Sequence, residues 1–448
     1  MSCPNHHRVA PQALVRALVT VSKGALWTAL VAALWCMAPT EAAAQTVAEA
    51  TPAPSRLTYN FGVDYMLHVS GRRNYPFSDD RFESGETFMW LRLRPRFSVR
   101  SKRLDILVEG QDTHSVNSRA DGGFTSRKAW LDLLNAYVDV RPAGGWSFKI
   151  GRQQGDLEVI PRMVRTSDFA AVIRSFDVAE VGWQKKNTDL RAFVFAPLDN
   201  LPSSFNRHKE GEILWTTYGK TKVRALSIQS YLIARRNTTV TSETGIPGSG
   251  AVYAWEVEGS GSTPVSNLTW TAESVVQRGH YSTDDVRAWG VFLRGDYALP
   301  RGNLVDVRYS VTSGDGATGD GTHGLFDTFY AASTNYGGLG LIKGSNIRSF
   351  TVGGLLRLSG PLTLNWRYFN AFLNNREDAW YGSVTPNISR DGASSSHVGQ
   401  ETNLTLGYRV TPKLLIRTAF HRFYSGAYPD PVNGHSPFEL RLQIIGGL

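Results

Sequence analysis

The stretch FMWLRLRPRFSVRS, residues 88–101, alternates between two kinds of side chain. The odd positions carry apolar side chains, and the even positions hold Arg92, Arg94, Arg96 and Arg100. Successive side chains of a β-strand point to opposite faces, so this stretch predicts a strand with one apolar face and one arginine-lined face. Because like charges repel, a soluble sheet gains nothing from such a face. The strand fits a wall that is apolar on one side and wet on the other.

About eighteen segments with period-two alternation follow residue 54. Each has about ten residues or slightly more, which is the length that a tilted strand needs to cross a bilayer. The chain also contains 43 Gly and 11% aromatic residues, with 42% hydrophobic residues and no long apolar run after the N-terminus, which favours a large β-structure over a bundle of transmembrane helices. The predicted strands are 57–70, 88–101, 104–114, 131–141, 146–154, 175–184, 189–197, 211–219, 223–235, 251–260, 267–278, 286–298, 303–313, 346–358, 362–373, 398–410, 414–424 and 437–446.

The connections between these segments alternate in length. Short turns read SKR, PAGG, KKNT, KTK, PRGN, SGP and TP, and long segments occupy 71–87, 115–130, 155–174, 198–210, 236–250, 314–345 and 374–397. This alternation is typical of an outer-membrane barrel, and a closed barrel is the only way for strands to satisfy their backbone in lipid. We therefore predict an all-β fold, a transmembrane antiparallel β-barrel of about 18 strands with short periplasmic turns and long extracellular loops. Loops 155–174 and 314–345 are expected to fold inward and narrow the pore.

Aromatic side chains near segment ends or on apolar faces predict a girdle at the membrane interfaces. Any one of them is explained equally well by ordinary packing, so the interpretation depends on the collective pattern. The residues are Tyr59, Trp90, Trp130, Trp146, Trp183, Trp215, Trp270, Trp289 and Trp366.

The N-terminus is typical of a secretory signal peptide. A basic region precedes the apolar stretch GALWTALVAALWCMA, and the small residues Ala42 and Ala44 mark a cleavage site. A buried N-terminal helix explains these small residues less well, and the bulky Trp35 argues against a lipoprotein anchor at Cys36. Both cysteines lie in this segment, so the mature chain is expected to have neither disulfides nor thiolate chemistry. The predicted organisation is 1–44 cleaved signal peptide, 45–56 short periplasmic segment and 57–448 one barrel domain.

Arginines recur on the phase that should face the lumen, and a ring of arginines gives a pore a preference for anions. They are Arg92, Arg94, Arg96, Arg191, Arg294, Arg308, Arg367 and Arg417. The alternative is that these charges pair across strands and hold the wall. Acids share the same phase, so selectivity cannot come from charge exclusion alone: Glu180, Glu256, Glu258, Glu273 and Glu401. The net charge of +9 fits an acidic partner, but no motif for nucleic acid is present.

Four stretches carry a resemblance to a known family: LRLRPRFSVR…LDILVEGQD, LLNAYVDVRPAGGWSFKIGRQQ, RSFDVAEVGW and TSGDGATGDGTHGLFDTFYAASTNYGG. In this order they make the chain similar to the alginate-export family of outer-membrane barrels. The resemblance implies an eighteen-stranded barrel with an electropositive lumen that passes an anionic polyuronate or a related acidic solute. By motif match it implies seven constriction charges: Arg94, Arg96, Glu109, Asp112, Arg152, Arg174 and Asp177. The chain departs from the usual barrel pattern in ending with IIGGL rather than an aromatic residue.

We expect a passive outer-membrane diffusion channel without a cofactor or metal. Its expected partners are outer-membrane lipid and lipopolysaccharide, an anionic saccharide or other acidic solute, and possible periplasmic export components, with the channel a monomer. One alternative is a porin for uptake of another small organic solute. A remote alternative is a barrel enzyme such as a phospholipase, which needs an outward His–Ser–Asn/Asp set that the apolar phases lack. The GDGATGDG loop resembles a calcium loop but has no closing glutamate.

Overall fold

The structure is a computed structural model. It describes residues 56–74, 85–116, 129–155, 159–166, 170–332, 336–382, 395–428 and 436–448. The predicted signal peptide and nearly all of the predicted segment 45–56 lie outside these ranges. Within them, no helix combines the length and the apolar character that a membrane span requires.

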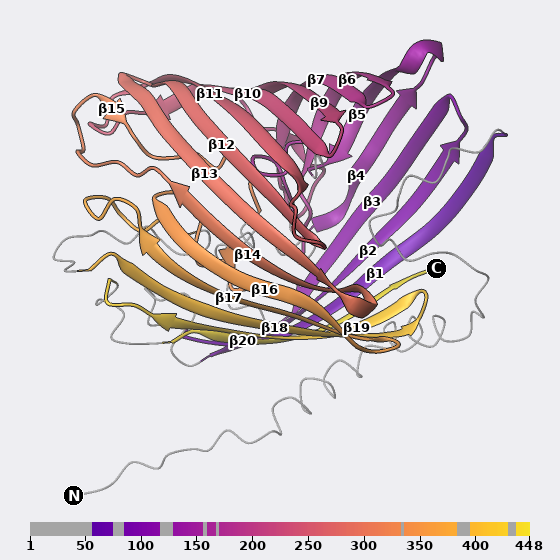
Figure 1. The fold of residues 1–448 in the computed structure, drawn as a ribbon. Coiled ribbons are helices and arrows are strands. Elements are labelled where there is room, and N and C mark those ends of the chain that lie inside the picture. Colours follow the sequence, from indigo (N-terminus) through magenta and orange to yellow (C-terminus); the bar gives the residue numbers. More distant parts are fainter. Residues whose placement is uncertain are drawn as a thin grey trace, which may run out of the picture. The chain divides into compact units, whose positions relative to one another are not determined.

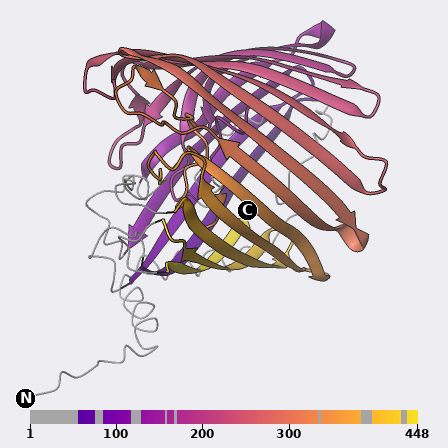
Figure 2. The same cartoon turned by 60° about the vertical axis from the view of Figure 1, so that its left-hand side comes forward.

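The described residues form eighteen long strands that follow one another in chain order around a barrel (Figures 1 and 2). The first nine are β1 (Thr58–Arg73), β2 (Glu86–Arg100), β3 (Leu104–Val116), β4 (Ala129–Val140), β5 (Trp146–Gln154), β6 (Ser175–Lys185), β7 (Thr188–Asp199), β9 (Glu212–Val223) and β10 (Leu226–Thr241). The others are β11 (Pro247–Ser262), β12 (Leu268–Tyr281), β13 (Asp284–Leu299), β14 (Asn303–Thr312), β16 (Ile347–Ser359), β17 (Leu362–Leu373), β18 (His397–Thr411), β19 (Leu414–Ser425) and β20 (Phe438–Gly447).

The barrel closes where its last strand meets its first. β20 pairs antiparallel with β1, from Asp64 opposite Gly447 to Arg73 opposite Phe438. Every long strand therefore has two neighbours, and among the residues described none of these eighteen strands leaves an open sheet edge. Four short elements lie in the connections: η4 (Ala143–Gly145), β8 (Arg207–His208), η5 (Pro300–Gly302) and β15 (Thr322–His323).

Each of the eighteen predicted segments overlaps one long strand, and the predicted bounds of β5 and β17 agree with the structure. Three details differ. The turn predicted at KTK lies inside β9, and the chain turns instead at 224–225, where Arg224 has a φ of 56°. The predicted loop 236–250 shrinks to 242–246, because β10 and β11 continue beyond the barrel wall as a hairpin. At the same end, β12 and β13 are joined by only two residues, 282–283.

The two faces of the strands separate as the alternation predicts. Outward positions such as Phe97 and Leu442 are exposed, while the alternate positions of the same strands are buried or partly buried. Trp90 corrects the girdle prediction, because it is only 2% exposed and stacks inside the barrel on His68, with ring centroids 4.5 Å apart. Trp130 and Trp146 are exposed on the outer face, as a girdle requires.

Apolar side chains fill part of the barrel interior. Ile160, Met163 and Val164, from the β5–β6 connection, are completely buried against inward-facing strand residues. Phe326, from the β14–β16 connection, joins the same cluster. A second cluster lies under Leu341 and its neighbours in the β14–β16 connection. Both connections that were expected to fold inward do so, because their apolar residues find partners only inside the barrel.

Candidate channel and its constriction

The two inward connections pair with each other inside the barrel. Val164 forms a parallel β-bridge with Tyr330. The Tyr330 N–H donates to the Met163 carbonyl at 2.8 Å, and the Arg165 N–H donates to the Tyr330 carbonyl at 3.1 Å. Residues 159–166 and 326–330 thus form one unit, here called the constriction pair. Such a unit narrows the lumen more firmly than a single loop can.

Charged groups fasten the first half of the constriction pair to the wall. Arg162 makes two parallel hydrogen bonds to Glu273 of β12, from Nε to Oε1 at 2.8 Å and from Nη2 to Oε2 at 2.6 Å. Its guanidinium lies 3.7 Å from the ring centroid of Phe292. Bidentate arginine–carboxylate pairs are strong and directional, so Arg162 fixes the depth at which the loop lies.

The second half is fastened through Asp327 and Tyr330. The Asp327 carboxylate accepts hydrogen bonds from Arg235 and, at 2.8 Å, from the Tyr281 hydroxyl. Burial opposes its ionisation, but the Arg235 guanidinium holds the pKa of Asp327 below its usual range. The Tyr330 hydroxyl donates to Glu212 Oε1 at 2.6 Å. Sequence analysis missed these anchors; the signal available was the apolar and aromatic character of residues 326–330 inside a long polar loop.

Most lumen-facing arginines pair with acids of the wall, and in most of these pairs the acid is the less exposed partner; Asp64, which is as exposed as Arg94 and Arg96, is an exception. Arg308 Nε lies 2.6 Å from Asp306 Oδ2, and their side chains are 30% and 4% exposed. Arg191 lies 2.9 Å from Asp189 and 3.5 Å from Glu180; the Arg191 side chain is 34% exposed and that of Glu180 only 7%. In these two pairs the longer arginine side chain is more exposed than the carboxylate that it contacts.

One part of the wall holds more arginines than acids. Arg294 lies 2.6 Å from Asp296. Arg308 and Arg367 both pair with Asp306, and the Arg367 guanidinium lies 3.7 Å from its carboxylate. Arg294, Arg308 and Arg367 come from β13, β14 and β17 and are called here the basic arc. It contributes three positive charges against two negative ones.

The arginine ladder of β2 is divided between two roles. Arg94 and Arg96 lie 3.5 Å and 3.1 Å from Asp64, and Arg94 also lies 3.7 Å from Glu109. All four side chains face the lumen. Arg92 is 4% exposed and donates to the Ala170 carbonyl at 2.5 Å, so it holds the end of the β5–β6 connection. Asp64 and Glu109 offset the repulsion between the arginines of the ladder.

Arg174 lies at the constriction pair itself. Its guanidinium stands over the Tyr330 ring, 4.7 Å from the centroid, and the side chain is exposed. Among the described residues, no carboxylate lies within ion-pair distance of Arg174. This places an exposed guanidinium beside Tyr330 of the constriction pair.

Three of the predicted constriction charges do not lie on the inward phase of their strands: Asp112, Arg152 and Asp177. Asp112 pairs in register with the outward Leu93 and bonds to His114 at 3.1 Å. Arg152 Nε lies 2.9 Å from Asp177 Oδ1. These two residues pair in register next to Gln153 and Phe176, which face inward, so they lie on the opposite face of their strands. All three belong to the outward phase near the long-loop end, because motif matching ignores strand phase. Arg152 also lies 3.6 Å from Oδ1 of Asp132, whose side chain is only 3% exposed.

A family model described as alginate export matches residues 71–435. The chain belongs to the alginate export family. A search among curated protein sequences found no significant match.

Solved structures similar to this alginate export family protein share its fold. They include Pseudomonas aeruginosa OccD3 (OpdP), with 12% sequence identity, a TM-score of 0.59, and 89% of this chain and 95% of that chain covered. Acinetobacter baumannii OccAB1 has 13% identity and a TM-score of 0.58, with 87% and 96% covered. P. aeruginosa OpdK has 13% identity and a TM-score of 0.55, with 87% and 99% covered. The protein is an outer-membrane β-barrel channel, and its short turns face the periplasm while its long loops are extracellular.

Proposed function

We propose that this protein is a passive, non-catalytic channel for acidic solutes, with an anionic polyuronate such as alginate as its cargo. The observation that carries the proposal is that guanidinium groups are more exposed than the carboxylates paired with them in β6, β7, β13 and β14, as in Arg308 over Asp306. A solute in the lumen meets planar donors that bind carboxylates through two hydrogen bonds. Membership of the alginate export family points to the same class of cargo.

The arrangement of the charges supports a series of weak solute contacts along the lumen rather than one tight binding site. The basic arc lies along the wall, and Arg174 lies at the constriction pair. A polyuronate carries one carboxylate per sugar, so it can exchange one guanidinium for the next. The acids behind the arginines weaken each contact, and conduction requires contacts weak enough to release the solute.

A second candidate is uptake of a smaller acidic organic solute. The constriction pair favours it, because two loops bonded to each other and to Glu273 and Gln277 of β12 leave less room for a polymer. We further propose that the barrel acts as a monomer surrounded by lipopolysaccharide, and that periplasmic export components deliver the cargo if it is a polymer.

Blocking of single-channel current distinguishes these candidates. Purified protein in a planar bilayer is exposed to oligouronates of several sugars, to a monouronate, and to a neutral oligosaccharide of matched length. A polyuronate channel is expected to show brief blockades whose frequency rises with oligouronate concentration. Blockades by the monouronate alone support the small-solute candidate. Equal blockade by neutral and acidic oligosaccharides contradicts the role of the arginines.

A further inference from the structure

Extracellular connections bring two carboxylates and an imidazole together, away from the charges of the proposed channel. Glu243 comes from the β10–β11 connection. Asp315 and His323 come from the β14–β16 connection, and His323 belongs to the short strand β15, which pairs with β13. Glu243, Asp315 and His323 are called here the extracellular triad.

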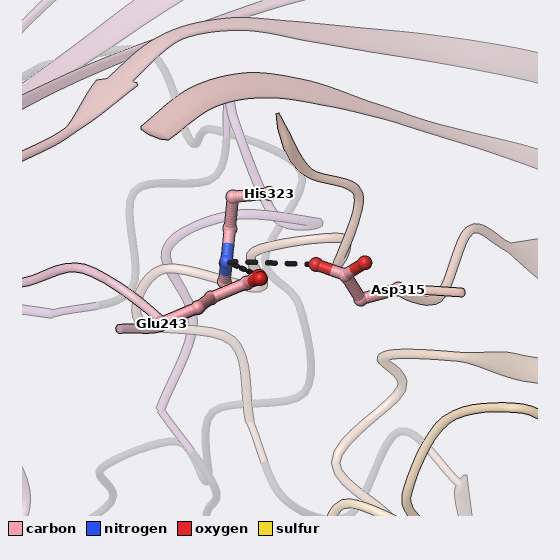
Figure 3. A group of neighbouring side chains, drawn as sticks. All are labelled: Glu243, Asp315 and His323. Carbon is pink, nitrogen blue, oxygen red and sulfur yellow. Dashed lines mark hydrogen bonds and ion pairs between the residues drawn. The ribbon is translucent and has the colours of Figure 1, made fainter. Parts of the chain in front are cut away.

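The geometry of the extracellular triad matches the first shell of a metal ion. Figure 3 shows the His323 ring nitrogen facing both carboxylates. Its Nδ1 lies 3.0 Å from Glu243 Oε1 and 4.0 Å from Asp315 Oδ2, and one ligand atom of each residue lies within 4.8 Å of the others. Zinc bonds of about 2.0–2.2 Å in a tetrahedron separate ligand atoms by roughly 3.4 Å. Shifts below an ångström therefore bring the three atoms around one ion.

Neighbouring groups hold the three side chains in this orientation. The Gly319 N–H donates to the second Glu243 oxygen at 3.0 Å, and the Gly324 N–H donates to Asp315 Oδ2 at 3.1 Å. The His323 ring packs edge-on against Tyr281, with centroids 5.0 Å apart. Outer contacts of this kind orient ligands in metal sites.

The charge of the cluster also favours a cation. The side chains of Glu243 and Asp315 are only 13% and 14% exposed, and Asp378 lies beside them, accepting the Asp315 N–H at 2.6 Å. The crowding of carboxyl groups thus exceeds what one imidazole can neutralise.

We propose that the extracellular triad binds one divalent transition-metal ion of the zinc class, with water in the remaining position. An imidazole ligand suits zinc, whereas calcium takes six to eight oxygens. The proposed zinc site differs from the calcium loop that GDGATGDG resembles. Asp315 of this stretch belongs to the extracellular triad, while Asp320 accepts a hydrogen bond from the Thr322 N–H at 2.7 Å. The ion ties the β10–β11 hairpin to the connection that continues into the constriction pair.

The test is zinc binding to the folded, metal-stripped barrel in detergent, measured by competition with a chromophoric zinc chelator. One zinc per chain is expected. His323→Ala and Asp315→Asn are each expected to weaken binding at least about 10-fold. The matched control is His280→Ala, an exposed histidine of β12, which should bind zinc as the unaltered protein does. Heat-modifiable migration in gels verifies that every variant is folded.

Three results overturn the proposal: no saturable zinc binding, unchanged affinity in folded His323→Ala, or a site that calcium fills equally well and that survives loss of the imidazole. Because the readout is binding rather than transport, its outcome is independent of which solute the channel passes.

Discussion

Single residues show how far strand phase determines the candidate site. Arg94, Arg96, Glu109, Arg191, Arg294, Arg308 and Arg367 face the lumen because each lies on the phase opposite the apolar stripe of its strand. Alternation is a local property, so the sequence alone predicts it. The pairing of each arginine with a particular acid depends on register, and β3 shifts register against β4 at Glu109/Gly110. Such shifts leave no mark that a single sequence reveals.

Removing one surplus charge of the basic arc tests the role of individual arginines. Arg367→Gln leaves the 2.6 Å pair between Arg308 and Asp306 in place, so the wall should keep its structure. A lost unit charge in a water-filled lumen changes the energy of a nearby anion by on the order of 1 kcal/mol, a few-fold in permeability ratio. The reversal potential in a salt gradient measures this change. Arg301→Gln, in a periplasmic turn, is the control and should leave selectivity unaltered.

The ladder of β2 supplies a test of the two faces. Replacing Arg94 and Arg96 together with Ser should lower anion preference while the barrel still assembles. Leu93→Arg places a charge on the outer face beside Asp112, its partner in register, and should impair insertion by less than the roughly 2–4 kcal/mol of a charge at the midplane. Folded yield in vesicles measures the assembly of both variants. The reversal potential in a salt gradient measures the anion preference of the double Ser variant. If Leu93→Arg assembles normally and the double Ser variant does not, the two faces have been assigned the wrong way round.

Among the elements, the inward connections define the channel more than the strands do. Their length and direction could be predicted, since long barrel loops commonly fold inward. Their mutual pairing could not, because the Val164–Tyr330 bridge and the Arg162–Glu273 pair join residues far apart in sequence. The short β10–β11 loop was mispredicted for a related reason: the hairpin extends past the region where a buried face enforces alternation.

Deleting residues 314–345 tests the β14–β16 connection. The Asn346 N–H donates to the Ser313 carbonyl at 3.1 Å, so the cut ends already lie together and the barrel should still close. Loss of Phe326 and Tyr330 removes half of the constriction pair. Single-channel recordings should show higher conductance and weaker selectivity. Unchanged conductance means that this connection does not limit the current.

A point substitution tests the fastening of the other loop. Arg162→Ala leaves the buried Glu273 without its bidentate partner, at a cost of about 1–3 kcal/mol for a pair that is partly exposed. The β5–β6 connection should then move, and open-channel current noise should rise. Arg165→Ala, an exposed position of the same segment, is the control. Equal noise in both variants argues against Arg162 as the anchor.

The architecture of the whole molecule could be predicted from the sequence more fully than its loops or its charge pairs. Eighteen segments, alternating connection lengths and closure between β1 and β20 all follow from backbone hydrogen bonding in lipid. We predict that the mature protein is found in the outer membrane, migrates as a heat-modifiable band and begins near residue 45. Membrane fractionation with N-terminal sequencing checks this expectation, and a soluble periplasmic protein contradicts it.

We infer that exposed guanidinium groups give this barrel a preference for anions. The most direct measurement is the reversal potential of the purified channel in a planar bilayer with a potassium chloride gradient. The account predicts a potential of the sign for chloride permeation, which moves toward zero in the Arg367→Gln and the Arg94→Ser, Arg96→Ser variants. A potential of the sign for potassium, or one that none of these substitutions moves, contradicts it and leaves the arginines as partners of the wall acids alone.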